Sequence, residues 1–206
     1  MPEFSSRDPS QPRFWDERFA AGFTPWESAD VAPALRRWLD TGGPAAGSRV
    51  LVPGCGSAVE LGLLAARGVD VLALDYSPVA VERARRQLPA LADRIRLADF
   101  FTFDAGPFDC IIERAFLAAL PPRLWQSWVD SCARLLRPGG MLAGAFFIDE
   151  SAADPRRGPP FAVTPAELRR LLGAAFEPVA DDAVAASESA PVFAGRERWQ
   201  VWRRRG

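Results

Sequence analysis

Short apolar runs alternate with stretches of helical spacing through the middle of the chain. Five runs predict buried strands, because each is rich in Val, Leu, Ile or Phe and is bounded by Gly, Pro or charged residues. They are RVLVP at 49–53, VDVLALD at 69–75, RIRLADF at 94–100, FDCIIE at 108–113 and MLAGAFF at 141–147. Helices are expected between several of them, at 60–67, 78–88 and 122–136. Strands that alternate with helices predict βαβ units, and therefore a parallel sheet with helices on both faces.

Further elements are expected on both sides of this alternating region. The helices are at 12–21, about 31–39 and 164–172, and two late strands are near 176–183 and 196–204. The second late strand alternates apolar and polar residues, which is typical of an antiparallel hairpin. The whole chain, 1–206, is expected to form one domain. Its first twelve residues, 1–12, are rich in Pro, Ser and charge and are expected to be flexible.

The first predicted strand ends in a glycine turn, PGCGS. Gly54 and Gly56 allow the backbone to come close to a ligand at the end of the strand. Val59 stands where a G-x-G-x-x-G fingerprint has its third glycine. Asp75 follows about 20 residues later, at the end of the second strand, where a carboxylate can bind ribose hydroxyls. The alternative for Asp75 is an acid at a helix start, but its spacing favours a nucleoside site.

The charge around this turn favours one kind of nucleoside ligand. No Lys or Arg lies between positions 50 and 66, so nothing in this stretch would pair with the two phosphates of a dinucleotide. A ligand with a single carboxylate, such as S-adenosylmethionine, suits the turn better than NAD(P) or FAD.

The third and fourth predicted strands also end in polar residues. Asp99 and Phe100 could accept an adenine amino group and cover the ring, or they could be a loop acid and a core residue. Glu113 and Arg114 end the fourth strand at the same carboxyl edge, which carries the ligand crevice in open α/β sheets. A structural ion pair between these two residues is the alternative to a catalytic role.

Composition excludes several kinds of chemistry. The chain has no histidine, which removes Ser-His-Asp and Cys-His catalysis and the usual zinc sites. Its three cysteines form no CxxC motif, so neither a metal site nor a disulfide framework is expected. A net charge of −1 predicts neither a nucleic-acid nor a membrane partner. The polar N-terminus and the lack of long apolar runs predict a cytoplasmic protein.

Several of these segments together resemble a known family. RFWDERFAAGFTPWES, the glycine turn with its flanking strands, ADFFTF, FDCIIERAFLAALPP, RPGGMLAGAFF and GPPFAVTPAELRRLL are similar to thiopurine S-methyltransferases and plant thiol/halide methyltransferases. The likeness covers about 14–176. It implies a Rossmann-like class I methyltransferase, with a helical cover at 13–42 over a core at 43–206 and a mostly parallel seven-stranded sheet whose last strand is antiparallel.

The resemblance also implies the ligands and their residues. S-adenosylmethionine would be the methyl donor, S-adenosylhomocysteine the product, and a small thiol or another soft nucleophile the acceptor. The residues expected at the cofactor are Trp15, Phe19, Trp26, Gly54, Gly56, Asp75, Tyr76, Ala98, Asp99, Phe100 and Glu113. Those expected at the acceptor are Trp26, Arg114, Phe116 and Phe161, with Arg114 and Glu113 as catalytic residues. No metal is expected.

Two features leave the acceptor open. The turn reads PGCGS where the thiopurine branch usually has PLCGK, and Glu113-Arg114 stands where that branch has Asp-Arg. The loop DPRRGPPF is either a lid that brings Phe161 to the acceptor, with Arg156 and Arg157 at its mouth, or a solvated connector. Transfer to halide, a chalcogen oxyanion, oxygen or nitrogen is the same-fold alternative. A nicotinamide oxidoreductase and a non-catalytic sensor of S-adenosylmethionine are the remoter ones.

Overall fold

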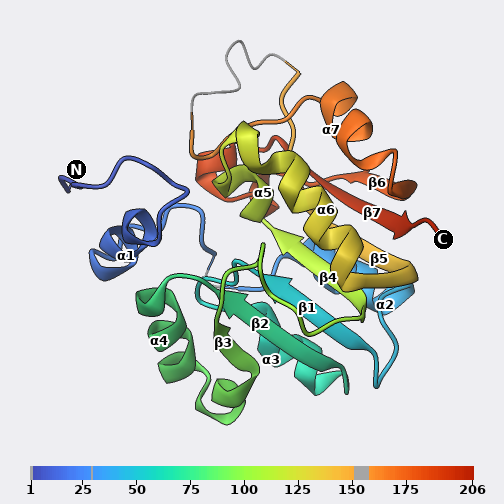
Figure 1. The fold of residues 1–206 in the computed structure, drawn as a ribbon, viewed down its shortest axis with the longest axis horizontal. Coiled ribbons are helices and arrows are strands. Elements are labelled where there is room, and N and C mark those ends of the chain that lie inside the picture. The colour runs from blue at the N-terminus through green and yellow to red at the C-terminus, as the bar shows by residue number, and fades with distance from the viewer. Residues whose placement is uncertain (1, 29, 151–157) are drawn as a thin grey trace.

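One seven-stranded sheet forms the centre of the molecule, with the strand order β3-β2-β1-β4-β5-β7-β6. The computed structural model describes residues 2–28, 30–150 and 158–206. The strands are β1 (Arg49–Pro53), β2 (Asp70–Asp75), β3 (Ile95–Leu97), β4 (Phe108–Arg114), β5 (Leu136–Phe147), β6 (Phe176–Ala183) and β7 (Glu197–Arg204). β1 to β5 run parallel, whereas β7 is antiparallel to both β5 and β6 (Figure 1). The predicted sheet is confirmed, including the antiparallel last strand.

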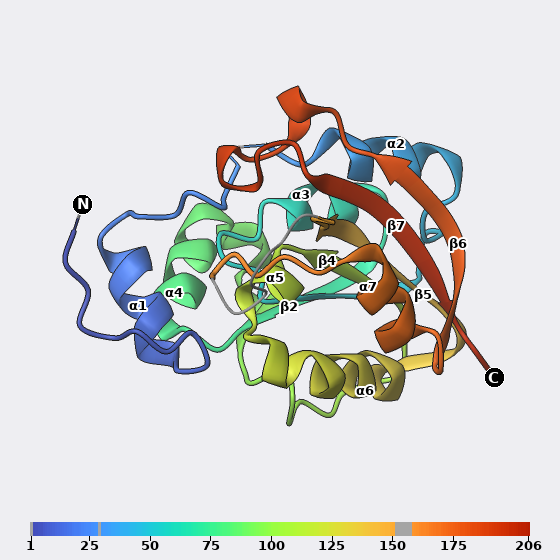
Figure 2. The same ribbon diagram turned by 90° about the horizontal axis from the view of Figure 1, so that it is seen from above.

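Helices cover both faces of this sheet (Figure 2). They are α1 (Pro12–Ala20), α2 (Pro33–Thr41), α3 (Glu60–Ala66), α4 (Pro78–Gln87), α5 (Phe116–Ala119), α6 (Trp125–Leu135) and α7 (Pro165–Leu172). One apolar cluster joins the sheet to α6 and α7, and a second joins it to α2, α3 and α4. Side chains of a strand alternate between faces, so Ile111 of β4 lies in the first cluster and Cys110 and Ile112 in the second. Burial on both faces explains the apolar runs of the sequence.

The helix starts follow from local chemistry. The Ser77 hydroxyl accepts a hydrogen bond from Ala80 N (3.2 Å) and caps α4, and Thr164 caps α7 by accepting from Glu167 N (3.2 Å). Each cap is followed by a proline at the first helical position, where no backbone N–H is needed. Among the described residues, no helix combines the length and the apolar character needed to cross a bilayer.

The observed elements differ most from the predicted ones at three places. β3 covers three residues, because Arg96 and Leu97 are exposed at the sheet edge and the chain turns away after them. β5 begins at Leu136, so the RPGG segment belongs to a strand and not to a turn before it. The short helix α5 was not predicted, since it depends on an acid outside its own sequence.

That acid is Glu113, at the end of β4. Its Oε1 accepts hydrogen bonds from the backbone N–H groups of Phe116 (2.6 Å) and Leu117 (3.0 Å), which start α5. Its Oε2 is buried and has no hydrogen-bond partner among the described residues. Only 1% of Glu113 is exposed, and this burial raises the pKa of its carboxyl to about 7. Glu113 therefore organises the backbone after β4.

The segment before α1 contacts the rest of the chain. The backbone N–H groups of Ser5 and Ser6 donate to Glu17 Oε2 at 2.8 and 3.0 Å. The Pro9 carbonyl accepts from Trp15 Nε1 (2.8 Å) and from the Tyr76 hydroxyl (2.9 Å). The flexibility of 1–12 stays a prediction, as does the division of the domain into cover and core.

We expect Glu113→Gln to remove a pH dependence of stability. Between the ordinary carboxyl pKa of 4.5 and about 7, the unfolded chain releases the Glu113 proton before the folded chain does. The free energy of unfolding therefore falls as the pH rises through this window. Gln cannot ionise and still offers an oxygen to the two N–H donors. In thermal unfolding experiments, the midpoint of the parent should therefore fall relative to that of the variant as the pH rises.

Glu82→Gln on α4 is the matched control, since its side chain is 76% exposed. Its melting curves should follow those of the parent at every pH. Parallel pH profiles for Glu113→Gln and the parent would contradict the role of Glu113 burial.

Candidate active site

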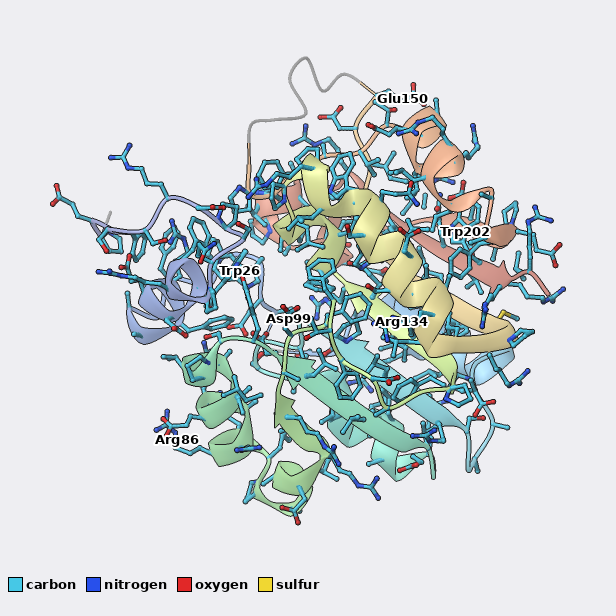
Figure 3. All side chains as sticks on the ribbon, viewed as in Figure 1. Trp26, Arg86, Asp99, Arg134, Glu150 and Trp202 are labelled. Carbon is cyan, nitrogen blue, oxygen red and sulfur yellow. The ribbon has the colours of Figure 1, made fainter. Side chains whose placement is uncertain are left out.

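A cavity of about 700 Å³ opens at the carboxyl ends of β1, β2, β3 and β4. It is lined by the residues that follow these strands and is covered by α1 and the loop after it. Twelve of the predicted site residues line it: Trp15, Phe19, Trp26, Gly54, Gly56, Asp75, Tyr76, Ala98, Asp99, Phe100, Arg114 and Phe116. Figure 3 shows Trp26 and Asp99 in this region, between α1 and the sheet. The position agrees with the edge where open α/β sheets bind ligands.

The glycine turn after β1 needs its glycines. Gly54 and Gly56 have φ angles of +58° and +51°, in the left-handed region that strains other residues. A Cβ at position 54 would lie 2.5 Å from Phe116 Cδ2. The turn therefore brings bare backbone to the cavity wall.

The carboxylate of Asp75 fixes this turn to the end of β2. Its Oδ2 accepts a hydrogen bond from Gly56 N (3.0 Å), and its Oδ1 accepts one from Ser77 N (2.9 Å). Only 6% of Asp75 is exposed, and burial raises the pKa of its carboxyl to about 6 in spite of these donors. Each oxygen keeps a lone pair, so Asp75 can position the turn and still accept a ligand hydroxyl.

The residues after β3 form the next part of the wall. Asp99 is exposed, and its Oδ1 accepts a hydrogen bond from Phe101 N (2.9 Å). Phe100 is buried and packs edge-on against Phe116, with ring centroids 5.4 Å apart. The structure thus places an exposed acid beside an aromatic wall, and the binding of adenine there stays a prediction.

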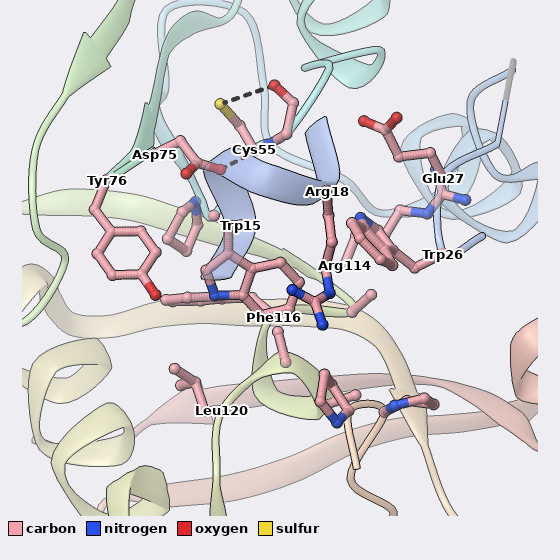
Figure 4. A pocket seen from close by; sticks show the side chains of 18 of the residues that line it. Trp15, Arg18, Trp26, Glu27, Cys55, Asp75, Tyr76, Arg114, Phe116 and Leu120 are labelled. Atoms are coloured by element: carbon pink, nitrogen blue, oxygen red, sulfur yellow. Dashed lines mark hydrogen bonds between the residues drawn. The ribbon is translucent and has the colours of Figure 1, made fainter. Parts of the chain in front are cut away.

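Aromatic side chains from α1 and the following loop form the cover. Trp26 meets Trp15 and Phe19 at nearly right angles, with centroid distances of 5.3 and 6.0 Å. Edge-to-face contacts of this kind hold rings in fixed orientations. Figure 4 shows Trp15 and Trp26 on either side of Arg18 above Phe116.

Arg114 forms an ion pair with a residue that the sequence analysis did not single out. Its Nη1 lies 3.0 Å from Glu60 Oε1, and the two side chains are 18% and 5% exposed. The structure pairs Arg114 with Glu60 and not with Glu113, the ion pair considered as an alternative to a catalytic role, because consecutive residues of a strand point to opposite faces. Glu60 begins α3 directly after the glycine turn, which is the signal that could have identified it.

Two of the predicted site residues do not line the cavity. Glu113 faces the backbone of α5, as described above. Phe161 is 6% exposed and packs in the cluster under α6 and α7, while Gly158, Pro159 and Pro160 of the same loop do reach the cavity. Phe161 is held there because its N–H donates to the Ala118 carbonyl (2.7 Å). Arg156 and Arg157 lie outside the described residues.

Glu27 is a further residue of the site that the sequence did not reveal. Its Oε1 accepts a hydrogen bond from Ser57 N (2.9 Å), and its Oε2 lies 3.0 Å from Arg83 Nη1 on α4. A Cβ at Gly56 would come within 3.1 Å of Oε1. Glu27 therefore connects the aromatic cover to the glycine turn. An acid in a turn carries no sequence signal for such a contact.

Cys55 lines the cavity but is not suited to act as a nucleophile. Burial raises the pKa of its thiol well above the ordinary value, and the nearby carboxylate of Asp75 acts in the same direction. The thiol therefore stays protonated, and the thiolate is the reactive form. Within the described part of the chain, no three His, Cys, Asp or Glu side chains are grouped so that they could hold a metal ion.

Solved structures with the same architecture include two methyltransferases with a bound cofactor or product. The 1,6-didemethyltoxoflavin-N1-methyltransferase of Burkholderia thailandensis, with S-adenosylhomocysteine bound, has a TM-score of 0.75 at 19% identity and covers 100% of this chain and 94% of its own. The magnesium protoporphyrin IX methyltransferase of Synechocystis PCC 6803, with bound S-adenosylmethionine, has a TM-score of 0.71 at 18% identity and covers 99% and 100%. At 18–19% sequence identity, this structural similarity establishes a shared fold.

Sequence relatives identify the family. The family model described as thiopurine S-methyltransferase (TPMT) matches residues 10–205. A probable thiol methyltransferase 2 of Arabidopsis thaliana is 34% identical over 164 residues, 77% of this chain and 70% of the relative. A thiopurine S-methyltransferase of Azotobacter vinelandii is 34% identical over 180 residues, 78% and 81% of the two chains. This chain therefore belongs to the thiopurine S-methyltransferase family of S-adenosylmethionine-dependent methyltransferases.

Proposed function

We propose that the protein transfers the methyl group of S-adenosylmethionine to the sulfur of a small thiol. One observation carries this proposal: a single cavity joins the glycine turn and Asp75 on one side to an aromatic cover and the Arg114–Glu60 pair on the other. The relatives named for thiol and thiopurine methylation support the same acceptor class. A cytoplasmic location and the absence of a nucleic-acid partner belong to this proposal and rest on composition and charge.

The residues present fit the proposed methyl donor. About 700 Å³ lies within the usual range of small-molecule sites, roughly 300–1,000 Å³. Gly54 and Gly56 would face the methionine part, Asp75 the ribose, and Asp99 with Phe100 the adenine. When bound, S-adenosylmethionine supplies a methyl group on a positively charged sulfur. The aromatic lining, whose ring faces attract positive charge, suits this cation.

The aromatic cover has two roles in this proposal. Trp15, Trp26 and Phe116 exclude water, and an apolar site favours a step in which an anion and a cation neutralise each other. Their ring faces also attract a nearby cation. Methyl transfer also requires the thiol sulfur and the methyl donor to be held in line. The packed rings of Trp15, Phe19 and Trp26 provide fixed cavity walls that can hold them so.

Arg114 is the group that would stabilise the acceptor as a thiolate. A free thiol has a pKa near 8.5, so a modest decrease makes it mostly ionised at neutral pH. A guanidinium within a few ångströms favours the anion, and the released proton passes to solvent. Glu60 orients Arg114 through their 3.0 Å contact. This chemistry needs no histidine, which agrees with the composition.

The first prediction from the proposed function concerns the reaction itself. We expect isothermal calorimetry to show binding of S-adenosylmethionine and S-adenosylhomocysteine, but not of NAD. A labelled-methyl assay should then show transfer to thiols in preference to halides, chalcogen oxyanions and amines. Binding of S-adenosylmethionine without transfer to any acceptor would favour a sensor over an enzyme.

A second prediction tests the contact between the cover and the turn. Glu27→Ala removes both the Ser57 hydrogen bond and the Arg83 ion pair, so the dissociation constant for S-adenosylmethionine should rise by about tenfold. Glu27→Gln keeps an acceptor for Ser57 N and should have a smaller effect. Asp30→Ala, an exposed acid in the same loop, is the control. Equal affinities for Glu27→Ala and Asp30→Ala would contradict the role of Glu27.

A third prediction concerns Arg114. In Arg114→Met the thiol loses its neighbouring cation, so the pH at which kcat/KM for a thiol reaches half its maximum should rise by about 1 unit or more. Activity should recover at high pH, where the thiol ionises unaided, and calorimetry should show a nearly unchanged affinity for S-adenosylmethionine.

Arg198→Met is the control for this series, because its ion pair with Asp181 lies in the β6–β7 hairpin. Its pH profile should match that of the parent. A profile for Arg114→Met that also keeps the parent midpoint would exclude Arg114 as the thiolate-stabilising group.

A further inference from the structure

Three acids of the cavity wall are already engaged by partners within the protein. Glu60 pairs with Arg114 (3.0 Å) and Glu27 with Arg83 (3.0 Å). Asp75 accepts hydrogen bonds from two backbone N–H groups. None of these three acids forms an ion pair with the positive charges of the cover, and Asp99, the fourth acid of the wall, is exposed.

Arg18 of α1 is one of these positive charges. It lines the cavity, is half-buried, and forms no ion pair with any carboxylate of the described residues. The adjacent acid, Glu17, is held by Arg13 (2.9 Å) and by the backbone of Ser5 and Ser6. Arg7 also lines the cavity, but it is exposed, so water solvates its charge.

The guanidinium of Arg18 has a fixed position. Its Cζ lies 3.3 Å from the ring centroid of Phe14 and 4.3 Å from that of Phe4, and its Nη1 donates to the Phe14 carbonyl (2.7 Å). Aromatic rings on a planar guanidinium orient it without using its N–H groups. Arginine has five N–H donors, so most of them remain for a ligand.

The surroundings of Arg18 favour an anionic ligand. Burial lowers the pKa of its guanidinium, and the charge of the adjacent Glu17 offsets this effect only in part. A carboxylate would supply that charge and accept two parallel hydrogen bonds from the planar fork. The rings of Phe4 and Phe14 leave the guanidinium edge as the surface on which such a ligand can bind.

We propose that Arg18 binds a carboxylate on the methyl acceptor, so that the preferred substrates are thiols that also carry an acid group. This inference rests on the proposed function, since it names the acceptor of the same site. Arg114 would face the sulfur and Arg18 the acid, at separate points of one cavity.

The carboxylate of S-adenosylmethionine is the other possible source of the same chemistry. We assign Arg18 to the acceptor because it lies on the cover, next to the outer pair Phe4 and Phe23, whose rings are 5.6 Å apart. In the view of Figure 4, the Trp15 indole lies between Arg18 and Asp75. The cofactor is expected at the strand ends, on the Asp75 side.

The test compares two acceptors of similar shape, 4-mercaptobenzoate and the neutral 4-methylbenzenethiol, with three variants. Arg18→Met should raise KM for the mercaptobenzoate by roughly 10- to 100-fold, as expected for a lost charged hydrogen bond, and leave KM for the neutral thiol unchanged. Arg18→Lys should retain part of the preference. Arg13→Met, on the same helix but 74% exposed and outside the cavity lining, should behave like the parent.

Direct binding provides a readout that does not depend on turnover. Calorimetry of 4-mercaptobenzoate with the protein saturated in S-adenosylhomocysteine should show the same loss of affinity in Arg18→Met. The affinity for S-adenosylhomocysteine itself should not change.

Each other outcome overturns the assignment. If Arg18→Met binds the cofactor more weakly and the KM values of both thiols rise equally, Arg18 binds the carboxylate of the cofactor. If the KM values and dissociation constants of both thiols are unchanged in Arg18→Met, Arg18 does not bind a ligand. If no thiol is methylated by the parent, the proposed function fails, while calorimetry still decides whether Arg18 distinguishes the acid from its neutral analogue.

Discussion

The buried carboxylate of Asp75 is the contact on which the arrangement of the site depends. It joins the N–H of Gly56 in the glycine turn to the N–H of Ser77 at the start of α4. The turn after β1 and the end of β2 are thereby held side by side, although 19 residues separate Gly56 and Asp75. A carboxylate that is 6% exposed is costly to keep ionised, so its two donors are needed to retain it there. Glycine is equally required, because a side chain at position 54 would enter the Phe116 ring.

Charge balance around an apolar cavity is the second constraint. The strand ends bring acids and arginines into a space whose walls are largely aromatic, where an unpaired charge is expensive. The pairs Glu60–Arg114 and Glu27–Arg83 reduce this cost and also fix positions. Glu60–Arg114 joins α3 to the end of β4, and Glu27–Arg83 joins the cover to α4. The contacts that neutralise charge therefore also fix these elements relative to one another. Arg18 differs from Arg114 and Arg83 because the rings of Phe4 and Phe14, and not a carboxylate, fix the position of its guanidinium.

Glu113 shows how one buried acid can serve the backbone and not the ligand. Its two accepted hydrogen bonds satisfy N–H groups at the start of α5, which have no partner within that helix. In this way α5 turns the chain away from the sheet and places Phe116 against the glycine turn. The residue that forms the inner wall of the cavity is therefore positioned by an acid that does not line it.

The sequence by itself determined the sheet, most helix starts and the strand ends that meet at the cavity. Those features depend on short-range patterns: apolar runs, Ser and Thr caps, and glycines followed about 20 residues later by an acid. It also brought nine of the site residues to one edge, because the carboxyl ends of parallel strands share it, whereas Trp15, Phe19 and Trp26 of the cover were expected only from the family resemblance. Only the tertiary structure decided the remaining features. They are the partner of Arg114, the position of Glu113 against the backbone of α5, the core position of Phe161, and the contacts of Glu27 and Arg18. Each depends on which face a side chain takes and on what packs against it from a distant part of the chain, and no local pattern encodes that.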